Sequence, residues 1–157
     1  MLTLYKPSLE ELSFRQELLA DEATMSYNHS YGGCIDFPQE KWEKWYEKWL
    51  RSNTNQYFYC YLYSEELKNF VGECAYRFDD GASRWYCDVI IHAKHRGKGF
   101  GTEGLRLLCE AAKAHGLTEL YDSIALDNPS IKLFLKNGFE EISRDEEAIL
   151  VKKILSK

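Results

Sequence analysis

The sequence lacks any apolar run long enough to cross a membrane. Nothing in its 157 residues approaches the roughly 20 consecutive apolar residues that a spanning helix needs. Met1 to Pro7 also lacks the basic start and apolar core of a signal peptide. We therefore expect a soluble, cytoplasmic protein with no membrane partner.

An excess of basic residues is also lacking. The 20 Lys and Arg residues are outnumbered by 25 Asp and Glu, which gives a net charge of -5 at pH 7. Nucleic acids and anionic membranes favour basic surfaces, so the balance argues against both as partners. A cationic small molecule suits an acidic protein better.

Cysteine motifs are missing as well. The five cysteines are odd in number and contain no C-x-x-C pair, and the four histidines do not recur at ligand spacing. We expect no metal site, and buried thiols in a reducing compartment. The residues are Cys34, Cys60, Cys74, Cys87, Cys109, His29, His92, His95 and His115.

What is present suits one hydrophobic core. Apolar residues make up 45% of the chain and aromatic residues 15%, and no repeat, low-complexity tract or linker divides it. We expect a single domain over residues 1–157. Residues 2–5 favour a short strand, the segment from Pro7 to about residue 19 favours a helix, and residues 21–38 favour a helical turn and a glycine-containing loop.

A third helical segment carries aromatic residues on one face. Trp42, Trp45, Tyr46 and Trp49 fall at i, i+3, i+4 and i+7, and charged residues occupy the other positions. These rings either pack on a sheet as core or, at the edge of the helix, form the wall of a substrate pocket.

The remainder of the chain alternates strand and helix signals. Residues 56–63, 70–78 and 84–91 are β-prone and separated by polar or turn-forming segments, which predicts an antiparallel meander. A helix to about His115, a strand at 120–126, a helix at 129–137 and strands at 139–143 and 147–154 follow.

The loop between the third strand of the meander and the next helix has the composition of an anion site. Glycines at 97, 99 and 101 allow close approach of the backbone to an anion, next to the positive end of the following helix. Basic side chains concentrate there in an otherwise acidic chain. The alternative is a loop with a purely structural role.

Two other phosphate-binding loops do not fit. A Walker-type loop has Ser or Thr after its lysine, whereas Gly99 follows Lys98. A dinucleotide fingerprint ends the first strand of a βαβ unit, whereas this loop follows several strands.

The segment from Val89 to Gly101 resembles the acetyl-CoA motif R/Q-x-x-G-x-G/A of the GNAT N-acetyltransferases, with its strand ahead and its helix behind. Asp127 to Phe139 resembles the family's second segment, N followed by L-Y-x-K-x-G-F, and its Asn128-to-Ile131 part is also similar to polyamine acetyltransferases. The two segments occur in the family's order and spacing. The N-terminal part matches only in its helical tendency.

This resemblance implies the GNAT fold, an α/β (α+β) arrangement with a central mixed, mostly antiparallel, twisted sheet of about seven strands and about four flanking helices. It implies that the single domain moves an acetyl group from acetyl-CoA to a primary amine of a small molecule. The amine would be polyamine-, aminoglycoside- or amino-acid-like, and it would attack directly in a ternary complex. The alternatives are a non-catalytic acyl-CoA-binding module and a protein or peptide N-acetyltransferase. A monomer or a homodimer is expected.

The resemblance also assigns contacts to the cofactor. The strand at 89–91 would hold pantetheine through its backbone, and residues 96–102 would hold the pyrophosphate. Asn128 would contact the pantetheine arm, and the helix at 128–137 would lie beside the sulfur. The expected residues are Val89, Ile90, Ile91, Arg96, Gly97, Lys98, Gly99, Phe100, Gly101, Thr102, Asn128, Ser130 and Phe134.

Direct transfer requires a base, because an amine of pKa about 10.4 is neutral only about once in 2,500 molecules at pH 7. Glu73 and Asp88 are the candidate catalytic residues, since each interrupts an aromatic or apolar strand. Either could instead face outward. Tyr27, His29 and Tyr31 are candidates for contact with the acceptor.

Phe134 departs from the family, in which a tyrosine at this position often protonates the leaving thiolate. Phenylalanine has no hydroxyl group, so another group must serve or the thiolate must leave unaided. A thiol of pKa about 8.5 is a fair leaving group. The hydroxyls considered as substitutes are those of Tyr76, Tyr86, Tyr121 and Ser123.

Overall fold

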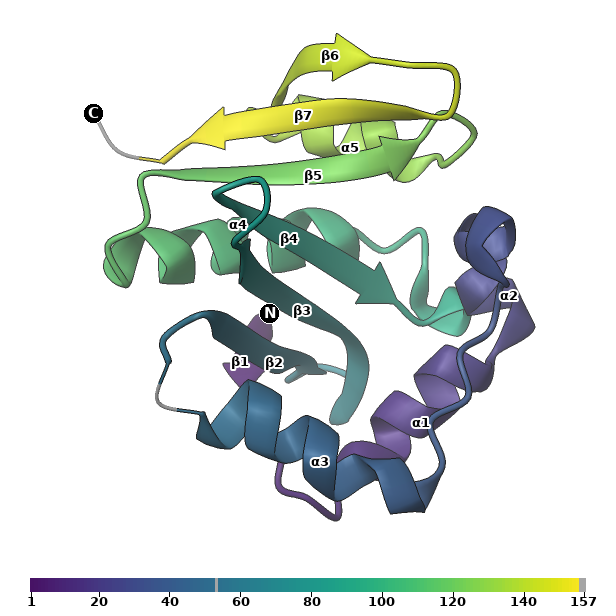
Figure 1. Ribbon diagram of the computed structural model, residues 1–157. Coiled ribbons are helices and arrows are strands. Elements are labelled where there is room, and N and C mark those ends of the chain that lie inside the picture. Colours follow the sequence, from purple (N-terminus) through teal and green to yellow (C-terminus); the bar gives the residue numbers. More distant parts are fainter. Residues whose placement is uncertain (53, 156–157) are drawn as a thin grey trace.

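A seven-stranded sheet forms the centre of the computed structural model, which describes residues 1–52 and 54–155 (Figure 1). The strand order is β1-β2-β3-β4-β5-β7-β6. All neighbouring strands are antiparallel except β4 and β5, which run parallel, so the expected mixed, mostly antiparallel sheet is confirmed. The strands are β1 (Leu2–Tyr5), β2 (Tyr57–Ser64), β3 (Asn69–Asp79), β4 (Arg84–Ile91), β5 (Glu119–Ala125), β6 (Glu140–Arg144) and β7 (Ala148–Ile154).

Helices cover both faces of the sheet. The α-helices are α1 (Leu12–Ala20), α2 (Glu22–Met25), α3 (Trp42–Tyr46), α4 (Phe100–Ala114) and α5 (Ser130–Lys136). Short 3₁₀ turns are η1 (Ser26–Tyr31), η2 (Gln39–Lys41) and η4 (Ala93–His95), and η3 (Glu47–Arg51) is a π-helical turn. About four helices were expected, and the additional α-helix of the described chain is α2, a single turn capped by Asp21, which accepts from the Thr24 amide.

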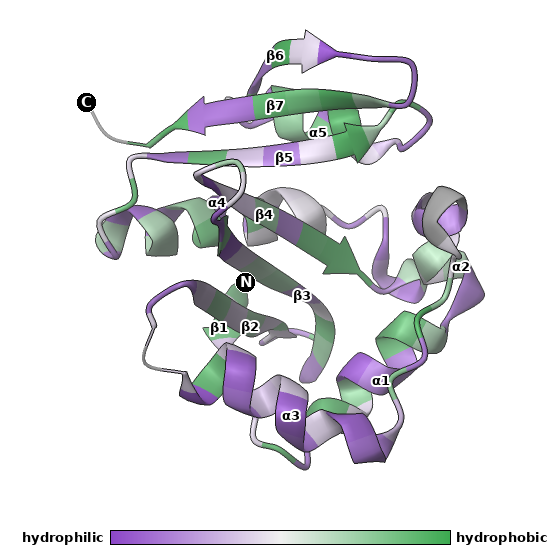
Figure 2. Cartoon of the chain, viewed as in Figure 1, coloured by the Kyte–Doolittle hydropathy of each residue, from purple (hydrophilic) through white to green (hydrophobic). Residues whose placement is uncertain are grey.

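Two layers of side chains follow from the alternation of the strands. Cys60 and Leu62 of β2 point to the face covered by α4 and α5, where they meet Leu105 and Leu108. Tyr59, Tyr61 and Ala75 point to the other face, where aromatic residues of α1, α3 and η3 cover them. Figure 2 shows hydrophilic residues on α1 and α3, the helices of this second face.

The aromatic segment is helical, as predicted, but it is not one regular helix. A 3₁₀ turn, an α-helix and a π-helical turn follow one another from Gln39 to Arg51. Trp42 is buried, and the ring centroid of Trp45 lies 4.7 Å from that of Tyr59, so these two rings belong to the core. None of the helices in the described chain is long and apolar enough to cross a membrane.

The cysteine prediction is correct for four residues and wrong for one. The residues in strands and in α4 are buried free thiols, whereas Cys34 is exposed. Cys34 follows the glycine loop at the end of η1, outside both hydrophobic layers. No strand or helix there holds its side chain in the core.

The parallel pair of strands separates almost as soon as it forms. A single register pair, Tyr86 with Tyr121, joins β4 to β5, whereas seven pairs join β5 to β7. Beyond Tyr86 the two strands diverge. Backbone groups on that side of β4 are therefore left for another partner, because buried amides and carbonyls require one.

Close approach of β3 to the end of β4 requires Gly72. A Cβ atom added there would lie 2.2 Å from the Ile90 carbonyl oxygen and 3.0 Å from the Ile91 Cα atom. Because backbone atoms cannot yield without moving β4, we expect Gly72→Ala to lower the free energy of unfolding by about 1–3 kcal/mol. Urea denaturation measures the change.

The matched control is Gly81→Ala in the turn between β3 and β4. Its added Cβ atom would meet nothing closer than 3.5 Å. A change within about 0.5 kcal/mol is expected there. Equal effects of the two substitutions would contradict the close contact at Gly72.

Candidate active site

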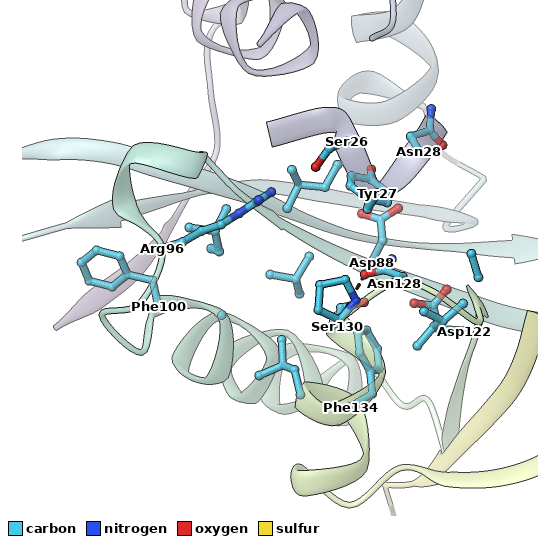
Figure 3. A pocket seen from close by; sticks show the side chains of 18 of the residues that line it. Ser26, Tyr27, Asn28, Asp88, Arg96, Phe100, Asp122, Asn128, Ser130 and Phe134 are labelled. Carbon is cyan, nitrogen blue, oxygen red and sulfur yellow. Dashed lines mark hydrogen bonds between the residues drawn. The ribbon is translucent and has the colours of Figure 1, made fainter. Parts of the chain in front are cut away.

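A cavity of about 680 Å³ lies where β4 and β5 diverge (Figure 3). One wall is the end of β4 from Asp88 to Ile91, and the opposite wall is β5 from Asp122 to Ala125. The loop ahead of α4, the start of α5 and the η1 turn complete it. The cavity therefore combines segments that are far apart in the sequence.

The glycine loop forms one end of this cavity. Gly97 and Gly99 have φ angles of 80° and 83°, in the left-handed region that favours glycine. Gly99 is the N-cap of α4, a helix of 15 residues, so the first-turn amides and the positive end of the helix dipole lie at the cavity. This geometry suits a phosphate group.

The residues expected to bind the cofactor mostly line the cavity. Lys98 and Thr102 are exceptions, since both are exposed and neither contributes to its walls. Arg96 lines it, but its guanidinium donates to the carbonyl oxygens of Ala23 at 3.3 Å and Thr24 at 2.8 Å. Arg96 thus ties the loop to α2. The binding roles themselves stay predictions.

Asn128, in the loop ahead of α5, and Phe134, within α5, both line the cavity (Figure 3). The Ser130 amide donates to Asn128 Oδ1 at 2.9 Å, which fixes the side chain of Asn128 and leaves its NH₂ group as a donor. The Phe134 ring is 2% exposed and packs on Phe139, with ring centroids 4.9 Å apart. An apolar ring thus stands where the family often has a hydroxyl group.

Two carboxyl groups stand between the diverging strands, Asp88 on β4 and Asp122 on β5. The carboxyl group of Asp88 borders the open cavity, so water can reach it. The walls of the cavity nevertheless surround the group with protein, and this partial loss of solvent raises the pKa of Asp88 to about 7. The charge of Glu73 adds to the rise, whereas Arg15 and Arg77 oppose it. Burial and the charge of Asp88 raise the pKa of Asp122 well above its usual value.

Sequence reasoning missed Asp122, although the available signal was the same one that marked Asp88. Each is a lone carboxylate in a β-prone stretch. Asp88, Asp122 and Ser123 also line a second cavity of about 260 Å³, with Trp49 and Tyr86 among its other residues. Trp49 of the aromatic segment thus lines a cavity, and the interpretation of that segment as the wall of a substrate pocket stays a prediction.

Glu73 lies elsewhere. Its Oε1 atom accepts from Arg15 Nη1 at 2.6 Å and from the Tyr59 hydroxyl, and its side chain is 5% exposed. Arg15 stacks over the Trp45 ring at 4.4 Å. Glu73 lines neither cavity, so its position suits a structural ion pair rather than a general base.

The candidates for contact with the acceptor lie on the η1 turn. Tyr27 and His29 line the larger cavity. His29 Nε2 lies 2.7 Å from Asp127 Oδ2, which links η1 to the loop between β5 and α5. The side chain of Tyr31 lies outside the described residues.

Of the hydroxyl groups considered as proton donors, that of Ser123 lies on a residue shared by both cavities. Tyr121 donates to Glu119 at 3.0 Å, and the Tyr76 hydroxyl lies 2.5 Å from His115 Nδ1.

His95 also lines the larger cavity, although no sequence pattern identified it as a site residue. Neither of its ring nitrogens has a partner among the described residues.

The ion pair of Arg15 and Glu73 leads to a stability prediction. Because both groups are mostly buried, Arg15→Met or Glu73→Gln alone should cost about 3–5 kcal/mol of unfolding free energy. The double variant should recover most of the loss, since no charge is then stranded. Urea denaturation completes the cycle. As a control, Arg106→Gln removes an exposed pair with Glu110 and should cost under about 1 kcal/mol.

Comparison with known proteins agrees with this geometry. The sequence model of the acetyltransferase (GNAT) family matches residues 16–139. A curated relative, an uncharacterised N-acetyltransferase named YobR from Bacillus subtilis (strain 168), is 35% identical over 57 residues, which is 36% of this chain and 23% of the relative. The matched part is thus under a quarter of the length of that relative.

Solved structures share the fold at low identity. A spermidine N-acetyltransferase from Vibrio cholerae in complex with CoA and spermine has a TM-score of 0.81 and 20% identity, over 98% of this chain and 95% of that one. An N-acetyltransferase, PaiA of Thermoplasma acidophilum, in complex with coenzyme A has a TM-score of 0.70 and 16% identity, over 98% and 99%. Since the family match spans most of the sequence, the chain belongs to the acetyltransferase (GNAT) family.

Proposed function

We propose that the protein is an acetyl-CoA-dependent N-acetyltransferase that acts on a primary amine of a small molecule. The observation that carries the proposal is one cavity that joins a phosphate-type loop to a pair of carboxyl groups. The loop suits the cofactor, and the carboxyl groups suit the proton transfers of the reaction. The reaction is direct attack in a ternary complex.

The shape and chemistry of the cavity fit the cofactor. The loop amides around Gly99 and the N-terminus of α4 would hold the pyrophosphate, and the unpaired edge of β4 would hold the amide groups of the pantetheine arm. Asn128 would donate to that arm. Acetyl-CoA supplies the thioester whose carbonyl carbon forms a bond to the amine nitrogen while the carbon–sulfur bond breaks.

Asp88 acts as the base in this proposal. It lies at the junction of the two cavities, within the site where an amine would have to lose its proton. With a pKa of about 7 it is ionised in roughly half of the molecules at neutral pH, which suits general-base catalysis. Glu73 is not needed for this role.

Asp122 supplies the proton that the missing tyrosine would have given. Burial and the neighbouring Asp88 raise the pKa of this carboxyl group well above its usual value, which favours its protonated form. One carboxyl group then takes the proton from the amine, while the other gives a proton to the departing thiolate. Two carboxyl groups with separated pKa values are a common basis for such a division of roles.

The acceptor classes consistent with this site are polyamines, aminoglycosides and amino acids. The spermine in the Vibrio cholerae structure supports the first class, although 20% identity supports a common fold rather than a common substrate. Phe134 favours the alternative of a non-catalytic acyl-CoA-binding module. Protein or peptide N-termini are a further alternative. A cytoplasmic monomer or homodimer that needs no metal completes the proposal.

Calorimetry with acetyl-CoA and a thiol-release assay with a panel of amines test the function. We expect binding, and thiol release with at least one amine. Gly99→Val should weaken binding roughly tenfold or more, because a β-branched residue does not tolerate the left-handed backbone at the loop. Gly81→Val, in an exposed turn without a positive φ, is the control. Absence of binding at millimolar acetyl-CoA would exclude the proposal, and binding without turnover of any amine would favour the non-catalytic module.

The proposed base sets a pH dependence. Because Asp88 must be ionised, kcat/KM should fall as the pH decreases through about 7, the pKa of its carboxyl group. Asp88→Asn should lower kcat by about 10²-fold or more and remove this acidic limb. Asp80→Asn, in the exposed turn after β3, should leave the profile unchanged. An acidic limb that persists in Asp88→Asn would assign the base elsewhere.

A further inference from the structure

We propose that the second cavity binds the acceptor and that Arg77 selects an amine that also carries a carboxylate, as a short amino acid does. The inference rests on the proposed function and narrows its substrate class. It starts from the second cavity, which contains none of the loop residues proposed to hold the cofactor.

The second cavity adjoins the larger one along β4, since Tyr86 to Asp88 line the second and Asp88 to Ile91 line the larger. It shares Asp88, Asp122 and Ser123 with the larger cavity, so an amine that enters here arrives at the proposed base. Trp49 and Tyr86 are among its lining residues. At about 260 Å³ it suits a small molecule rather than a folded partner.

The second cavity carries one basic side chain beyond the two aspartates that it shares with the larger cavity. Asp88 and Asp122 lie at the inner end. Arg77 lines the cavity further out, next to Tyr86, and its guanidinium carbon lies 5.5 Å from the centroid of that ring. Its side chain is exposed, and no carboxylate of the described residues lies within ion-pair distance of it.

The register of β3 and β4 gives the spacing. Asp88 pairs with Ala75 and Tyr86 with Arg77, so Arg77 lies two residues from the position opposite Asp88, about 7 Å along the strand. Both side chains project from the same face of the sheet. That spacing suits an amine and a carboxylate separated by a short chain.

Asp79, the other charged residue in the outer lining of the second cavity, does not neutralise Arg77. It lies two residues beyond Arg77 on the same face, but its Oδ1 atom accepts from the Gly81 amide at 3.1 Å, so the carboxylate is engaged by the turn between β3 and β4. The outer part of the lining therefore carries Arg77 and an aspartate that already has a hydrogen-bond partner. A second ammonium group placed there would meet repulsion from Arg77, whereas a carboxylate would gain a guanidinium partner.

The test compares acceptors that differ only in the group distant from the amine. The acceptors are 4-aminobutyrate, n-butylamine and 1,4-diaminobutane. We expect 4-aminobutyrate to have the highest kcat/KM of the three, by about tenfold. The difference should lie mainly in KM.

Arg77 is tested by substitution. Arg77→Gln should abolish the preference for the carboxylate, and Arg77→Glu should shift it toward 1,4-diaminobutane. Each kcat/KM is divided by that of n-butylamine for the same variant, because loss of Arg77 also alters the pKa of Asp88 and hence the activity with every amine. Arg106→Gln on the exposed surface of α4 is the control and should retain the preference. Arg77 is exposed, so these variants should fold.

The outcomes separate the two proposals. Preference of the unaltered protein for the diamine, or a preference that survives Arg77→Gln, would overturn this inference and leave the acetyltransferase function standing. Binding of acetyl-CoA with no turnover of any amine would overturn both.

Discussion

The short pairing between β4 and β5 is the constraint on which the site depends. One register pair holds the two strands together at Tyr86 and Tyr121, and the strands diverge beyond it. The divergence opens the larger cavity, frees one edge of β4 for a ligand and places a carboxyl group from each strand in the gap. A continuous parallel ladder would close the gap and pair the groups that a cofactor would use.

The open gap has a cost in stability. Between the usual pKa of an aspartate and the value of about 7 for Asp88, the folded chain holds a proton that the unfolded chain has released. Stability contributed by this group therefore falls as the pH rises through that range. Asp122 acts in the same direction. The ladders of β3 with β4 and of β5 with β7 flank the gap and keep its walls in place, so the proposed site lies between two well-paired parts of the sheet.

The sequence predicted the parts of the site that depend on neighbours along the chain. The strand, the glycine loop and α4 are local features, and the alternating glycines mark the left-handed positions at Gly97 and Gly99. The partner of Glu73 was not predictable, because Arg15 reaches it from α1, 58 residues away. The second cavity likewise depends on how η3 packs against β2, which the local sequence does not determine. Asp122, by contrast, could have been predicted, because the sequence shows it as a single carboxylate within a β-prone segment, as it does Asp88.

The ion pair of Arg15 and Glu73 decides which acidic residue of this face can act as a base. Glu73 and Ala75 are two residues apart on β3, so their side chains project from the same face of the sheet. Asp88 lies opposite Ala75, so the carboxylates of Glu73 and Asp88, on adjacent strands, share that face. Arg15 neutralises Glu73, and the Tyr59 hydroxyl completes its hydrogen bonding. Asp88 has no such partner within the described chain and opens on both cavities. A helix that matches the family only in its helical tendency thus supplies the charge that separates a structural carboxylate, Glu73, from the proposed base, Asp88.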